Sequence, residues 1–247
     1  MSSYLTISET STTINVSTDD WEIEFDEAKG GVIDKWCQDG GSTNYASSSD
    51  GLFSFINRGA SYWYQNNTTG AIMTLVESGP NKVVIKAVGE MDDVAGHDFE
   101  ITYTVYTSGH IFIRFIFTNN TGGDLACTSY NNLGLLKIDF TNYTNSAAVV
   151  DDYDNYPTYN KQFWYGLIST DDFNSVILYI LHIENSKSYQ QTLGSSSSSA
   201  YYYHNDSETF SDGERYITNA CLYIGGQETS QAEIEADGEY LLDFVII

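Results

Sequence analysis

The stretch that decides the fold is residues 97–121, HDFEITYTVYTSGHIFIRFIFTNNT. Large apolar side chains occupy every second position of residues 99–105, and polar side chains lie between them. Residues 107–109 are turn formers, and Ile111, Ile113, Phe115 and Phe117 then place large apolar side chains on one face of a return strand. Because a period of two places successive side chains on opposite faces of a strand, this stretch predicts a β-hairpin.

The return strand of this hairpin is apolar on both faces. Its second face consists of Phe112, Arg114 and Ile116, of which only the arginine is polar. A strand that is apolar on both faces is typical of the middle of a sandwich, where other elements cover it. The sequence therefore predicts that both faces of this strand are covered.

The same period recurs along the chain. Further strands are expected at residues 21–26, 32–36, 71–77, 82–90, 133–139, 162–169, 175–183, 215–224 and 239–247. No dozen residues show a 3.6 period with caps, so we expect little or no helix. About fifteen short strands predict an all-β fold, a large antiparallel sandwich. Without a fixed repeat or a linker (residues 195–199, SSSSS, are read as a loop), one domain over residues 1–247 is expected.

The charge balance excludes several classes of partner. The chain has 34 acidic and 10 basic side chains, a net charge of −24. This charge repels phosphate backbones and anionic lipids, so we expect no nucleic-acid or membrane partner, and it favours a neutral glycan over an acidic one. No apolar run reaches the roughly 18–20 residues of a membrane span. The content of 41% hydrophobic residues excludes disorder, and the 20 tyrosines cannot all be buried.

The three cysteines, Cys37, Cys127 and Cys221, are far apart in the sequence. Their odd number and spacing predict buried thiols or one long-range disulfide rather than a disulfide framework.

The start of the sequence and its composition bear on localisation. The sequence starts MSSYLTI without the charged and apolar regions of a signal peptide, so the protein is either intracellular or an excised piece of a longer one. The Ser-, Thr-, Asn- and Tyr-rich composition favours an extracellular or cell-surface location.

Three segments resemble a known superfamily. Residues 21–36, WEIEFDEAKGGVIDKW, are similar to the opening hairpin of the galactose mutarotase-like β-supersandwich. Residues 97–121 resemble the central hairpin of that fold, and residues 163–179 resemble a later strand pair. The resemblance runs in order over roughly two thirds of the chain. It implies a supersandwich related to sugar epimerases and to the β-domains of glycoside hydrolases and polysaccharide lyases.

The resemblance also implies where an epimerase would keep its proton-transfer groups. In those enzymes a histidine after the central hairpin acts as acid and a late glutamate acts as base. Here Asn131 and Asn132 stand where the histidine is expected, although a late glutamate such as Glu214 is present. Because asparagine exchanges no proton near neutral pH, the sequence argues against epimerase chemistry.

Aromatic and amide side chains mark the candidate sugar-binding residues. Flat rings cover the apolar C–H faces of sugars, and amides bond to their hydroxyls. Each cluster could equally be core or sheet edge, because alternation turns neighbouring rings to opposite faces. The candidate ligand-binding residues are Tyr62, Trp63, Tyr64, Trp164, Tyr202 and His204.

Two further candidates concern chemistry. Asp151, Asp152 and Asp154 crowd carboxylates as a Ca²⁺ site requires, but without EF-hand spacing, so a solvated acidic loop is the alternative. His97, beside Gly96 and Asp98, is the best proton-transfer candidate. Three functions therefore remain: a carbohydrate-binding or accessory domain, a carbohydrate-active enzyme, and a structural surface domain.

Overall fold

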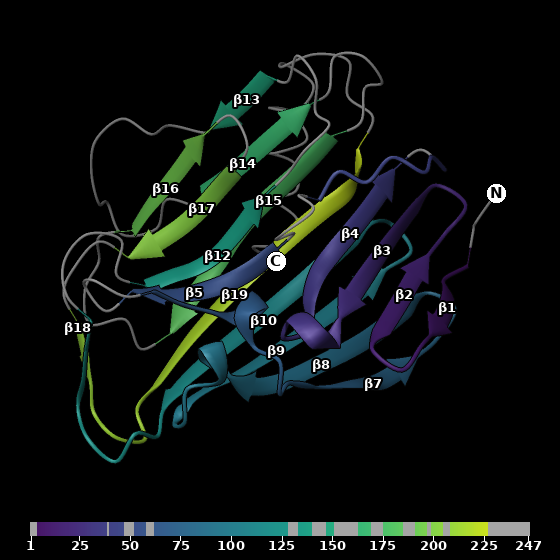
Figure 1. Ribbon diagram of the computed structural model, residues 1–247. Coiled ribbons are helices and arrows are strands. Elements are labelled where there is room, and N and C mark those ends of the chain that lie inside the picture. Colours follow the sequence, from purple (N-terminus) through teal and green to yellow (C-terminus); the bar gives the residue numbers. More distant parts are fainter. Residues whose placement is uncertain are drawn as a thin grey trace.

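The computed structural model describes residues 4–38, 40–46, 52–57, 62–127, 133–139, 147–150, 163–168, 175–184, 191–196, 199–204 and 208–226. Within these ranges the chain forms two large antiparallel sheets and a two-stranded one (Figure 1). The only helical segments there are three short 3₁₀ turns, η1 (Glu27–Lys29), η2 (Gln65–Asn67) and η3 (Met91–Asp93). The all-β prediction is confirmed.

The first sheet has nine strands in the order β1-β2-β3-β4-β5-β12-β17-β16, and β6 pairs with β5 beside this path. Every pair in it is antiparallel. Its strands are β1 (Thr6–Glu9), β2 (Thr13–Ser17), β3 (Trp21–Asp26), β4 (Val32–Gln38), β5 (Leu52–Asn57), β6 (Tyr62–Tyr64), β12 (Leu133–Asp139), β16 (Gln191–Ser196) and β17 (Ser199–His204).

The second sheet has eight strands in the order β13-β14-β15-β19-β10-β9-β8-β7, again antiparallel. Its strands are β7 (Ile72–Ser78), β8 (Lys82–Glu90), β9 (His97–Tyr106), β10 (His110–Asn119), β13 (Ala147–Val150), β14 (Phe163–Ile168), β15 (Ser175–Glu184) and β19 (Arg215–Gly226). The short third sheet pairs β11 (Leu125–Cys127) with β18 (Glu208–Phe210).

One hydrophobic core fills the space between the two large sheets. In Figure 1 the purple strands of the first sheet lie over the teal strands of the second. Trp21, Ile23 and Phe25 of β3 alternate inward and meet the second sheet, where the rings of Phe25 and Tyr103 are 4.8 Å apart. Burial of such a face is the main term that stabilises a sandwich.

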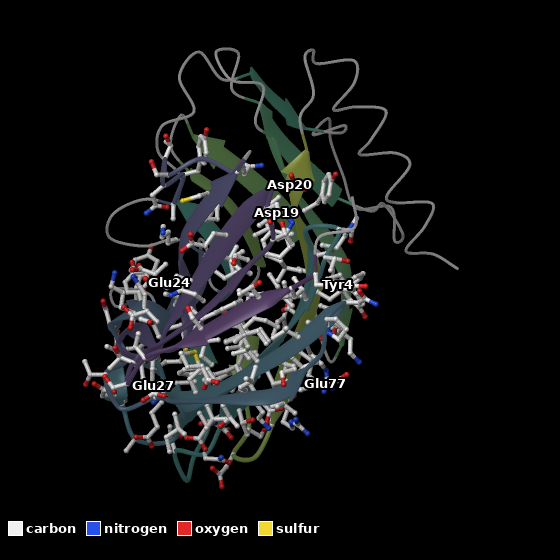
Figure 2. All side chains as sticks on the ribbon, turned by 90° about the vertical axis from the view of Figure 1, so that its right-hand side faces the viewer. Tyr4, Asp19, Asp20, Glu24, Glu27 and Glu77 are labelled. Carbon is white, nitrogen blue, oxygen red and sulfur yellow. The ribbon has the colours of Figure 1, made fainter. Side chains whose placement is uncertain are left out.

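Polar side chains also join the sheets. The buried Gln38 Nε2 donates to the carbonyl of Ile224 over 2.6 Å. At the edge where β1 and β7 lie, Glu27 Oε2 accepts the N–H of Met73 over 2.9 Å. Figure 2 shows the molecule from this side and labels five acidic side chains on it: Asp19, Asp20, Glu24, Glu27 and Glu77.

The observed strands overlap the predicted ones at every predicted segment within the described residues, and the segment at residues 239–247 lies outside them. The loop predicted at residues 195–199 is wrong at three of its positions, because Ser195 and Ser196 belong to β16 and Ser199 begins β17, while residues 197 and 198 lie outside the described residues. Cys37 and Cys221 are buried free thiols, in line with the thiol prediction. The sequence predicts that both faces of β10 are covered. On the outer face Ile116 is buried but Arg114 is exposed, so the prediction is wrong in the middle of that face.

Candidate ligand site on the outer face of the eight-stranded sheet

Strands β9, β10 and β19 bring distant residues together on one face. Their inner residues, such as Ile113 and Phe115, are buried in the core. On the other face Arg114 pairs with Thr102 of β9 and with Asn219 of β19. The long strand β19 thus inserts a residue from late in the chain beside the central hairpin, because register alone fixes which side chains are neighbours.

A pocket of about 240 Å³ opens on this face. Sites for drug-sized ligands enclose roughly 300–1,000 Å³, so this one has room for about one sugar ring. The residues that line it come from the three neighbouring strands: Thr102, Thr104, Phe112, Ile113, Arg114, Asn219 and Ala220.

The pocket combines an aromatic ring with hydrogen-bonding groups. Phe112 is half-buried, and its ring meets that of Tyr106 edge-on with centroids 5.8 Å apart. Arg114 is exposed and offers a planar guanidinium with five N–H donors. The Asn219 amide both donates and accepts, as do the two threonine hydroxyls. Such a set can hold a ligand that has an apolar face and a rim of oxygen atoms.

A second aromatic pair lies at the turn end of the same strands. His110 stacks on Tyr223 with ring centroids 4.6 Å apart, and its Nδ1 lies 2.8 Å from Ser108 Oγ. Burial lowers the pKa of His110 below its ordinary value of 6.5, so the imidazole is neutral at pH 7. This pair extends the aromatic surface beyond the pocket without adding a charge.

The predicted aromatic segment on β6 divides between surface and core. Tyr62 is 40% exposed, and its ring stacks on that of Tyr64 with centroids 5.8 Å apart. Tyr64 packs against Val32, whereas Trp63 points inward and packs against the core. The ligand role of all three stays a prediction, and only Tyr62 presents an exposed ring.

His97 begins β9 and lies in the interior. It is 4% exposed, and its ring centroid is 4.1 Å from that of Trp63 and 6.4 Å from that of Phe117. The pocket lining does not include it. Its role as a proton-transfer residue stays a prediction, and it would require a local opening for a substrate to reach the ring.

The other predicted ligand residues lie on strands of both sheets. Trp164 of β14 pairs with Tyr179, which pairs with Cys221, which in turn pairs with Phe112 of the pocket. Trp164 is thus in the same cross-strand row of paired residues as Phe112. Tyr202 and His204 lie on β17 of the nine-stranded sheet. The ligand-binding role of Trp164, Tyr202 and His204 stays a prediction.

The predicted calcium site, Asp151, Asp152 and Asp154, lies outside the described residues, as do Asn131 and Asn132. Within the described ranges no three His, Cys, Asp or Glu side chains gather as metal ligands. None of the helices found there has the length and apolar character that crossing a membrane demands.

Sequence reasoning missed Arg114 and Asn219. Arg114 stands in the sequence as the one polar residue of an apolar face, and Asn219 belongs to a strand that is more than 100 residues away. The available signal was the charge itself, because an arginine in the middle of an apolar strand is costly to bury and has to find either solvent or a partner.

Comparison with known proteins identifies the class of fold. No protein-family model and no curated protein sequence matches the chain. Among solved structures, a candidate aldose 1-epimerase from Klebsiella pneumoniae subsp. pneumoniae MGH 78578 is similar, with a TM-score of 0.60 and 8% identity over 93% of this chain and 83% of that one.

A mutant of the heparan sulfate lyase HepC from Pedobacter heparinus is also similar, with a TM-score of 0.51 and 12% identity. The match covers 92% of this chain but 36% of the lyase, so the chain spans about a third of that protein's length. At these identities the likeness establishes a shared β-sandwich fold, in line with the predicted resemblance.

Proposed function

We propose that this protein is a carbohydrate-binding β-sandwich domain, and that it serves as an accessory domain of a surface or secreted carbohydrate-active protein. The observation that carries the proposal is the pocket in which the Phe112 ring lies beside Arg114 and Asn219. Sugars present C–H faces to aromatic rings and hydroxyls to amides and guanidinium groups. The proteins of similar fold whose names refer to sugar chemistry support the same class of ligand.

The pocket gives the proposal a defined ligand size. A volume of about 240 Å³ suits recognition of single sugar units along or at the end of a glycan. Binding by one ring and a few hydrogen bonds is weak at a single site, as an accessory domain requires when it only holds a catalytic partner near its substrate.

A broad glycan array followed by affinity gels with soluble polysaccharides tests the proposal. We expect the wild-type protein to bind at least one class of glycan and Phe112→Ala to weaken that binding about tenfold, because the ring face is lost. Tyr4→Ala is the matched control, since Tyr4 is a 65% exposed aromatic residue outside the pocket. A blank array and blank gels would show that the proposal is wrong.

Tyr62→Ala separates the two aromatic surfaces. If the pocket is the site, this variant binds as the wild type does. Loss of binding in Tyr62→Ala with full binding in Phe112→Ala would instead place the site on β6 and the stacked pair of Tyr62 and Tyr64.

A further inference from the structure

We infer that the sugar held in this pocket carries a carboxylate, and that Arg114 is the residue that binds it. The inference rests on the proposed function and narrows its ligand to uronate-containing glycans. It depends on the charge pairing of the described residues, on the position of Arg114 in the sheet, and on the groups around it.

Arg114 differs from the placed lysines in its charge pairing. Six of the ten Lys and Arg side chains are placed by the structure, and all four lysines among them pair with a carboxylate. The pairs are Lys29–Asp34, Lys35–Glu22, Lys82–Glu77 and Lys86–Glu100, with N–O distances of 2.6, 2.9, 2.9 and 2.7 Å. Arg114 forms no such pair within the placed side chains, although acidic residues outnumber basic ones more than threefold.

The position of Arg114 explains why it remains available. Its cross-strand neighbours are Thr102 and Asn219, which are uncharged. The nearest acidic position on β9 is Glu100, whose carboxylate is 2.7 Å from Lys86 Nζ. Among the residues that the structure describes, the pocket lining includes no acidic one. A cation on a central strand that has no carboxylate partner among the placed side chains is a ready site for an anionic group of a ligand.

The surrounding groups fit a sugar carboxylate. A guanidinium binds a carboxylate through two parallel N–H···O bonds, a geometry that the ammonium group of lysine does not offer. The Asn219 amide and the hydroxyls of Thr102 and Thr104 can then bond to the ring hydroxyls, and Phe112 lies against the C–H face. A uronate ring has all three features within one sugar unit.

The net charge of −24 argues for neutral ligands only at long range. At physiological ionic strength charges are screened over about 8 Å, so distant carboxylates contribute little inside the pocket. Contact with Arg114 therefore decides the local preference. The chain charge slows the approach of a polyanion, which predicts that salt raises the association rate while it weakens the bound state.

The test compares uronate polysaccharides with their neutral counterparts. Oligosaccharides of polygalacturonate, alginate and hyaluronan are titrated by calorimetry beside carboxyl-reduced forms of the same chains. We expect at least one uronate to bind more tightly than its reduced form, and Arg114→Gln to lose about tenfold to a hundredfold in affinity for it while binding the reduced form as before. Arg114→Lys should recover part of the loss.

Arg215→Gln is the matched control, because Arg215 is an exposed arginine of the same sheet outside the pocket, and it should change nothing. Equal binding of charged and reduced chains, unaffected by Arg114→Gln, would overturn the inference and leave the proposed function intact. Preference for a sulfated, uronate-free carrageenan would likewise overturn it. If no glycan binds at all, the proposed function fails and the inference with it.

Discussion

The two faces of the β9–β10 hairpin are built from the same strands but differ in burial. On the inner face, Phe115 and Phe117 are at most 1% exposed and belong to the hydrophobic core. On the outer face, Phe112 is half-buried and Arg114 is exposed in a pocket. Both faces of β10 are rich in apolar residues in the sequence, so hydrophobicity alone does not separate them.

Which face of a strand becomes core therefore depends on whether another element packs on it, rather than on its composition. The inner face meets a second sheet and gains from close packing over its whole length. The outer face of the same strand is partly open, and there the chain places one cation among uncharged groups. An apolar face that is left open beside polar groups is typical of a binding surface.

Core packing on the inner face should give the greatest loss of stability. Phe115→Ala should lower the free energy of unfolding by about 3–5 kcal/mol, because it empties space that the surrounding sheets cannot refill. Phe112→Ala, on the outer face, should cost less than half of that. Urea unfolding followed by fluorescence measures both variants, and equal losses would contradict the distinction between the faces.

The next effect concerns the close approach of the two sheets. Gly31 has a φ of +72°, and a Cβ there would lie 2.3 Å from the Cβ of Ala87. Gly31→Ala should cost about 2–4 kcal/mol, the sum of left-handed backbone strain and overpacking.

Gly122→Ala is the matched control for this prediction. Gly122 has a φ of +81° but no neighbouring atom within 4 Å of an added Cβ, so it pays the backbone strain alone. Thermal unfolding of the two variants isolates the contact. A loss at Gly122 as large as that at Gly31 would show that the space between the sheets is not limiting.

The smallest expected effect is the pH dependence of stability that Tyr103, a buried residue of the inner face, contributes. Tyr103 is fully buried, and burial raises the pKa of its phenol well above the ordinary value of 10. Because the unfolded state then releases its proton first, Tyr103 contributes stability that is present below about pH 10 and is lost as the pH rises further.

Tyr103→Phe should therefore flatten the fall in stability between pH 9.5 and 11, because phenylalanine has no phenol to titrate. Urea midpoints across this pH range measure the difference. The cysteines titrate alike in both proteins, so parallel curves for wild type and variant would contradict the prediction.

Much of the fold could be predicted from the sequence, because period-two alternation is a local property. Residues 99–105 alternate regularly between apolar and polar side chains and residues 107–109 are turn formers, so the hairpin could be predicted, and the observed register agrees with it. The pocket could not be predicted in the same way. It depends on the pairing of β10 with β19, and that pairing is fixed by the packing of the whole sheet rather than by any pattern near Arg114.

The same limit applies to His97 and Trp63. Both residues carry useful chemistry, and the sequence alone could not tell that their rings lie 4.1 Å apart in the interior. Tyr62, one position earlier in the strand, is exposed because alternation turns it outward. The period of two predicted that Tyr62 and Trp63 point to opposite faces of their strand, although it could not say which of them faces solvent.

The carboxylate of Glu27 at the Met73 N–H has a consequence for self-association. Strand β7 is an outer strand whose Ile72 and Val76 side chains are 63% and 58% exposed, so it is a template onto which another chain could add. Glu27 accepts the N–H of Met73, which is one of the donors of this strand. Together with the net repulsion between copies, this edge chemistry protects the protein from aggregation at neutral pH, and that protection is weakest near its pI of about 4.1, where the repulsion vanishes.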